Sequence, residues 1–207
     1  MTPVELGALS QLPCYGSFRL TDAVRPGPGL SLAPREGYRI EKYRNRSARL
    51  RIPVLSASVS RERLFEIFLR LLEPLGDEVD VVLETSHAGG EGHRDFRRRH
   101  IDRPVLESYL CEFEDHLLND GCTGVAVIAT RRPMEVQFDE HKLLICYARN
   151  LRPFRSILDS AGITRSDSLP LLFDAPHLHF SRPGAADRFV DLAWRLGVGA
   201  EADMVAG

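Results

Sequence analysis

Residues 60–85, with the sequence SRERLFEIFLRLLEPLGDEVDVVLET, join an amphipathic helix to a short apolar strand. Apolar side chains recur at positions i, i+3, i+4 and i+7 along residues 64–75. Ser60 is a suitable N-cap and Gly76 a typical helix stop. The apolar run EVDVVLET that follows is typical of a strand buried on both faces. The helix is therefore predicted to pack its apolar stripe against a sheet that contains this strand.

Two hairpins flank this helix–strand pair along the chain. YRIEKYR (38–44) and ARLRIPVLSASV (48–59) alternate in polarity and are joined at NRS. MEVQF (134–138) and KLLICYA (142–148) are joined at DEH. Both pairs are expected to enter the sheet as neighbouring antiparallel strands.

The remaining elements follow from periodicity and from capping residues. They are a helix over 104–119 that begins with Pro104 behind Asp102, a strand over 122–130, a helix over 151–161, a strand over 177–181, and a last helix capped by Ser181. Strand–helix units mixed with hairpins indicate an α+β fold. We predict a single domain with a mixed β-sheet of about six to seven strands, including the hairpins, covered by four main helices.

The expected domain boundaries follow the composition of the chain. Residues 1–37 are predicted to be an irregular N-terminal arm, because a proline- and glycine-rich loop lies at its end. The α+β domain is predicted to extend over 38–197. Residues 198–207 are mostly small and are expected to form a flexible C-terminal tail.

Bulk composition excludes several classes of protein. The 207 residues are 43% apolar and 27% charged, as in an ordinary globular protein, and their formal net charge of −2 makes nucleic acid an unlikely partner. Neither a secretory leader nor an apolar run long enough for a membrane helix is present, so a cytoplasmic protein without a membrane partner is expected. The basic residues are 25 arginines and only two lysines, which lowers the functional weight of any arginine cluster.

The four cysteines give no metal-binding motif. Cys14, Cys111, Cys122 and Cys146 are too far apart in the sequence to form the ligand pairs of a zinc site. Reduced thiols are the expected state. The sequence leaves the cofactor of the protein, if it has one, unassigned.

The segment 86–103 combines glycines, histidines and arginines directly after the strand 78–85. Ligands of α/β units collect where strand ends meet helix N-termini, and glycines let the backbone approach a phosphate. Our leading hypothesis is a binding module for an anionic, phosphate-bearing small molecule on this loop, although a solvated mobile loop is the simpler interpretation. The predicted ligand-binding residues are Gly89, Gly90, Gly92, His93, Arg94, Arg97, Arg98 and Arg99.

A hydrolytic enzyme is the first alternative. Glu84, His87, His93 and Asp95 are residue types that transfer protons near neutral pH, and they are the predicted catalytic residues.

In HLHFS (177–181), His177 and His179 point to the same side of a strand and form a predicted metal-binding pair. Two histidines hydrogen-bonded to their neighbours are the simpler interpretation. The enzyme hypothesis requires the pair to meet His87 or His93 at one end of the sheet. FDEHK (138–142), which also holds a histidine and two carboxylates, is interpreted as a solvated hairpin turn.

A structural or interaction protein that self-associates is the second alternative. Residues 35–51 carry seven basic side chains interleaved with Tyr38 and Tyr43, whereas other parts of the chain are acidic. A basic face on one subunit could meet an acidic face on another, so a homodimer is plausible.

Overall fold

A computed structural model describes residues 14–27, 33–45, 50–87 and 93–198, and within them the fold is α+β as predicted. Seven strands form one sheet, in the order β4-β5-β10-β9-β8-β6-β7. Their bounds are β4 Gly37–Asn45, β5 Leu50–Ser58, β6 Glu78–Thr85, β7 Arg94–Asp102, β8 Thr123–Ala129, β9 Met134–Phe138 and β10 Leu144–Ala148. Every neighbouring pair in this sheet is antiparallel, so the predicted mixture of parallel and antiparallel strands is wrong.

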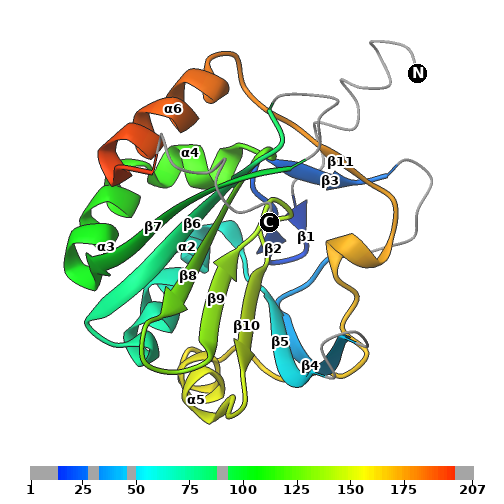
Figure 1. The fold of residues 1–207 in the computed structure, drawn as a ribbon. Helices are drawn as coiled ribbons and strands as arrows, with labels where there is room; N and C mark the ends of the chain where they lie inside the picture. The colour runs from blue at the N-terminus through cyan, green and yellow to red at the C-terminus, as the bar shows by residue number, and fades with distance from the viewer. Residues whose placement is uncertain (1–13, 28–32, 46–49, 88–92, 199–207) are drawn as a thin grey trace.

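The described helices cover one face of the sheet (Figure 1). They are α2 Arg61–Leu72 with the 3-10 turn η1 Glu73–Leu75, α3 Arg103–Glu112, α4 Glu114–Asn119, α5 Arg152–Ser160 and α6 Ala185–Leu196. All five contribute side chains to one core with alternate strand residues such as Val79, Val81 and Leu83. The alternation follows from the two-residue period of a strand. The other face of the sheet lies in front in Figure 1 and carries no α-helix of the described chain, although Leu169, Leu171 and Phe173 pack against part of it.

The helices differ from the predicted four in two places. The helix expected over 104–119 is broken at Phe113, which has φ −109° and ψ 15° and separates α3 from α4. The last helix starts at Ala185 rather than after Ser181. Its N-cap is Gly184, whose φ of 81° is a conformation that glycine adopts without strain.

The segment predicted as a long loop over 86–103 is mostly a strand. β7 pairs with β6 from Glu78 opposite Asp102 to Thr85 opposite Arg94, and only residues 86–93 connect them. This strand was not predicted because β7 lies at the edge of the sheet. Charged side chains there replace the alternation of apolar and polar residues that is typical of a strand. The sheet end that bears the connection is therefore far from the N-terminus of α3, which follows the other end of β7.

A small two-stranded ribbon lies beyond the end of the main sheet (Figure 1). It pairs β3 (Val24–Pro26) with β11 (His177–His179), and so joins the N-terminal segment to the C-terminal part of the chain. The region predicted as an irregular arm thus contains β3 and two shorter strands, β1 (Cys14–Tyr15) and β2 (Phe18–Arg19). Phe18, Leu20 and Val24 pack there with Leu172 of the 3-10 turn η2 (Leu172–Asp174).

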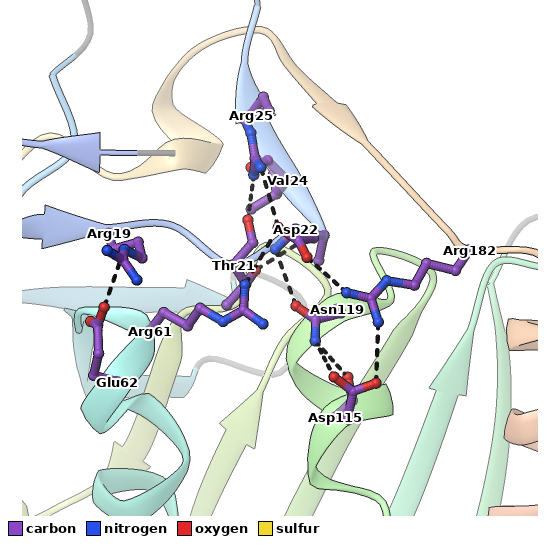
Figure 2. A network of polar contacts seen from close by, with 11 residues as sticks. Arg19, Thr21, Asp22, Val24, Arg25, Arg61, Glu62, Asp115, Asn119 and Arg182 are labelled. Atoms are coloured by element: carbon purple, nitrogen blue, oxygen red, sulfur yellow. Dashed lines mark hydrogen bonds and ion pairs between the residues drawn. The ribbon is translucent and has the colours of Figure 1, made fainter. Parts of the chain in front are cut away.

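A polar network fastens this ribbon to the helices, as Figure 2 shows. Arg182 donates to Asp22 at 2.8 Å and to Asp115 of α4 at 3.2 Å. The Oδ1 atom of Asn119 accepts a hydrogen bond from the backbone N of Asp22 at 3.3 Å, and Arg61 of α2 lies 3.4 Å from the Asp22 carboxylate. These contacts hold the segments before β3 and after β11 against α2 and α4.

Candidate metal centre

Three imidazoles meet where the β3–β11 ribbon crosses the end of the main sheet. His177 and His179 come from β11, on the same side of the strand as predicted, and His141 comes from the turn between β9 and β10. The ring centroids are 4.5 Å apart for His141 and His177, 5.0 Å for His141 and His179, and 4.9 Å for the two β11 residues. Each ring offers one nitrogen to a group whose members all lie within 4.8 Å of one another. The cluster joins two segments that are 36 residues apart.

The hydrogen bonds of the three rings define their protonation. His177 Nδ1 lies 2.8 Å from the carbonyl oxygen of Ala175, and His179 Nδ1 lies 2.6 Å from that of Gly121. A carbonyl oxygen only accepts, so both Nδ1 atoms carry a proton. His141 Nδ1 lies 2.8 Å from Asp139 Oδ2 and donates to the carboxylate in the same way. In the neutral rings every Nε2 is then an unprotonated donor of an electron pair.

This arrangement is unfavourable without a cation. His141 Nε2 and His177 Nε2 are 3.0 Å apart, and with both Nδ1 atoms protonated the two contacting atoms present lone pairs to each other. A proton or a metal ion shared between them removes that repulsion. Imidazole nitrogen with its other nitrogen bound to a carboxylate or carbonyl is the usual form of a metal-binding histidine. The residues therefore fit a transition-metal ion such as Zn²⁺.

Asp139 shapes the turn that presents His141. Its Oδ1 accepts from the backbone N of Leu143 at 2.8 Å while its Oδ2 accepts from His141. Lys142 has a φ of 60°, which is a left-handed conformation that costs a residue with a side chain about 1 kcal/mol. The buried ammonium of Lys142 donates to the carbonyl oxygen of Thr123 at 2.8 Å. The turn is thus anchored from both sides, which makes the direction of the His141 ring well defined.

Gly121 permits the close approach of β11. Its backbone N donates to Phe180 O at 2.8 Å, and Phe180 N donates to Ala23 O at 2.8 Å, while the Gly121 carbonyl holds His179. A Cβ atom at Gly121 would overlap the carbonyl oxygen of Ala23 and lie 2.9 Å from that of Phe180. Because both obstacles are backbone atoms, only glycine fits at this crossing.

Burial and charge act differently on two of the three rings. Burial lowers the pKa of His141, but the hydrogen bond and charge of Asp139 outweigh it and raise that pKa above the ordinary value. The pKa of His179 is lowered, first by burial and further by the charges of His141 and His177. Crowding of three basic rings thus favours at least one unprotonated ring, which is the state that binds metal.

The predicted catalytic residues lie at the same end of the sheet but outside the three-histidine cluster. His87 Nε2 lies 2.9 Å from Asp120 Oδ2, and exposed His93 lies 3.6 Å from Glu140 Oε1. Glu84 and Asp95 are opposite each other on β6 and β7. Burial, and then the charge of Asp95, raise the pKa of Glu84 to about 7. HLHFS and this segment lie at the same end of the sheet, as the enzyme hypothesis required, but His177 and His179 meet His141 rather than His87 or His93, so the predicted convergence is not seen.

The arginines predicted to bind an anion do not converge in the described part of the segment. Arg97 and Arg98 point to opposite faces of β7: Arg97 lies 2.5 Å from Asp80, and Arg98 donates to the carbonyl oxygen of Leu196 at 2.9 Å. Arg94 lies over the ring of Phe96 at 5.2 Å, and Arg99 is exposed. The predicted contacts Gly89, Gly90 and Gly92 lie outside the described residues. Anion binding by this segment stays a prediction.

Sequence reasoning missed His141, which was interpreted as part of a solvated turn. Its side chain is partly buried because β11 crosses over the turn, and no local pattern reports that crossing. The available signal was the spacing of Asp139 and His141, in which a carboxylate precedes an imidazole by two residues. That spacing allows the carboxylate to orient the ring, but it is common in turns.

Comparison with family models, with curated proteins and with solved structures found no match to this chain. Within the described ranges, none of the helices is both long and apolar enough to cross a membrane. The chemistry of the three-histidine cluster is therefore the main indication of function.

Proposed function

We propose that the protein is a metal-dependent hydrolase whose divalent ion, Zn²⁺ in the first instance, is bound by His141, His177 and His179. The observation that carries the proposal is the commitment of all three Nδ1 protons to acceptors outside the cluster. This leaves the three Nε2 lone pairs as ligands. The contact of 3.0 Å between His141 Nε2 and His177 Nε2 is an N–H hydrogen bond when one of the two rings carries an extra proton, and a bound metal ion would take the place of that proton.

The number of ligands favours a catalytic rather than a structural ion. Within the described residues the group has three members, and catalytic zinc sites use three protein ligands and keep the fourth position for water. All three rings are partly exposed, so water can reach the ion. A bound zinc ion lowers the pKa of its water to about 7, which supplies hydroxide near neutral pH.

Glu140 is the residue that we assign to proton transfer from that water. It follows Asp139 in the same turn, is only partly exposed, and its charge raises the pKa of both His141 and His179. The hydroxyl of Ser86 lies 3.3 Å from Glu140 Oε2 and can orient the carboxylate. A carboxylate beside a metal-bound water is the usual general base of a zinc hydrolase.

The experiment is metal loading followed by a hydrolysis screen. Purified protein is stripped with EDTA, loaded with Zn²⁺ and dialysed, and its metal content and its activity on chromogenic carboxylic and phosphoric esters are measured. His177→Ala should lose one zinc per chain and all metal-dependent hydrolysis. His100→Asn is the matched control, because it also removes an imidazole, lies on an exposed part of β7, and places asparagine where φ is 55°.

The outcomes separate binding from catalysis. Glu140→Gln should retain the zinc but lose most of the hydrolytic rate. Equal zinc content in the wild type and in His177→Ala would overturn the metal site. Zinc binding without hydrolysis of any ester would remove the catalytic part of the proposal and leave the metal site in place.

A further inference from the structure

A second group of metal-ligand side chains lies next to the three histidines. His87, Asp120 and Cys122 offer one ligand atom each, and these atoms all lie within 4.8 Å of one another. The group shares no residue with the site proposed above. The two groups are nevertheless directly linked. Gly121 lies between Asp120 and Cys122, and its carbonyl oxygen accepts the hydrogen bond of His179.

Asp120 is the unusual member of this group. The residue is 1% exposed, and its Oδ2 accepts from Thr123 at 2.5 Å and contacts His87 Nε2 at 2.9 Å. Its Oδ1 is buried and makes no hydrogen bond within the described chain. A buried carboxylate oxygen without a donor is costly, and in native proteins such an atom is commonly satisfied by water or an ion.

The charge state of Asp120 adds to this argument. Burial alone would raise the pKa of the carboxyl group, but the hydroxyl groups of Thr123 and Ser181 and the charge of His87 lower it below its ordinary value. The nearby His116 does not supply a positive charge near neutral pH, since burial lowers its pKa to about 4. The geometric observation is that one buried carboxylate oxygen, Oδ1, faces no hydrogen-bond donor of the described chain.

We propose that His87, Asp120 and Cys122 bind a second transition-metal ion, of the zinc class, through one nitrogen, one oxygen and one sulfur atom. Zn²⁺ and Co²⁺ accept this mixture of ligands. On binding, the ion takes the place of the hydrogen between His87 Nε2 and Asp120 Oδ2, and that proton moves by way of solvent to His87 Nδ1, so that the ring stays neutral. The thiol of Cys122 releases its proton to solvent and binds as a thiolate. The free Oδ1 of Asp120 is available to the ion or to a water molecule that the ion binds.

Cobalt loading tests the second site through its sulfur ligand. Metal-stripped full-length protein is titrated with Co²⁺ while the near-ultraviolet thiolate-to-cobalt charge-transfer band is recorded, and zinc content is measured in parallel. The wild type should bind two ions per chain and show the band. Cys122→Ser should lose the band, and its affinity for one of the two ions should fall by about 100-fold or more, since even losing a partner of a ligand costs 10–100-fold.

Two variants keep the result unambiguous. Cys111→Ser removes an exposed thiol and should leave both ions and the band unchanged. His177→Ala should bind one ion and retain the band, which separates this inference from the proposed function. A wild type without a thiolate band, or a band that persists in Cys122→Ser, would overturn the second site. If the wild type binds one ion, shows no band, and loses that ion in His177→Ala, only the first site exists.

Discussion

The two candidate metal-binding clusters at this end of the sheet differ in how their polar atoms are paired. In the first cluster, His141, His177 and His179 face one another with no carboxylate between them, and their acceptors lie on the outer side of each ring. In the second, the carboxylate of Asp120 lies between His87 and the Thr123 hydroxyl, and accepts from both. The first cluster therefore needs a proton or a metal ion between its rings, whereas in the second only the Oδ1 atom of Asp120 lacks a donor within the described chain.

The comparison explains why one cluster is the stronger candidate. A network in which donors meet acceptors stabilises the folded chain whether or not a ligand binds. A group of facing lone pairs does not, and it is expected only where something else occupies the centre.

Gly121→Ala should have the largest effect. The new Cβ overlaps the backbone oxygens of Ala23 and Phe180, the residues next to β3 and β11, so the ribbon must move and take His179 with it. We expect zinc binding at the three histidines to be lost and stability to fall by about 1–3 kcal/mol. Metal content and urea unfolding measure the two effects. Gly162→Ala is the control, because it has a φ of 76° but open space around it, and it should cost stability without changing the metal content.

Asp120→Asn should destabilise the metal-free protein far more than His177→Ala does. Burial lowers the pKa of the Lys142 ammonium to about 8, and the negative charge of Asp120 is the largest of the effects that favour its charged form. Asparagine removes that charge and weakens the hydrogen bonds that Oδ2 accepts from Thr123 and His87, which should cost about 1–3 kcal/mol. His177→Ala removes a facing lone pair and should cost less than about 1 kcal/mol in the stripped protein. Urea midpoints of both variants in EDTA test this, and similar losses in the two would contradict the comparison.

Asp139→Asn should weaken metal binding without unfolding the turn. The amide oxygen of asparagine can still accept from Leu143 N, but the negative charge that orients and polarises His141 is gone. We expect zinc affinity to fall by about 10–100-fold, the range found for such supporting carboxylates. Zinc titration by calorimetry measures it, with exposed Asp167→Asn as the control. Unchanged affinity would mean that Asp139 serves the turn alone.

Glu84→Gln tests the electrostatics of the sheet face that lacks helices. The pKa of this carboxyl is about 7 in the folded protein against an ordinary 4.5, so the folded state holds a proton that the unfolded state loses between these pH values. Stability should therefore fall as pH rises from about 4.5 to 7 and stay constant above. The glutamine variant should be more stable by about 1–2 kcal/mol at pH 8, after allowance for solvent screening, and equal to the wild type at pH 4. Parallel pH dependence in the two proteins would contradict the assignment.

The parts of the fold that sequence reasoning predicted are those built from local patterns. The helix from Arg61, the two hairpins and the α+β class were confirmed because periodicity and capping act over a few residues. The strand β7 was not predicted, since at the edge of a sheet arginine and aspartate can occupy positions that central strands reserve for apolar residues.

The candidate site shows the same division. His177 and His179 were predicted to share one side of a strand, because that property is local. His141 and Gly121 were not predicted, since their importance arises only when β11 crosses the end of the sheet and brings together segments 36 and 58 residues apart. Neither a two-residue spacing nor a lone glycine carries that information along the chain.

The most direct test of the account is the position of zinc in crystals of the loaded protein. Anomalous scattering at the zinc edge locates the ion independently of any assay. We predict a peak bonded to the Nε2 atoms of His141, His177 and His179 at about 2.0–2.1 Å, with water in the remaining position. Loaded crystals with no peak among these three rings, or rings that pair by an N–H group instead, would contradict the central claim.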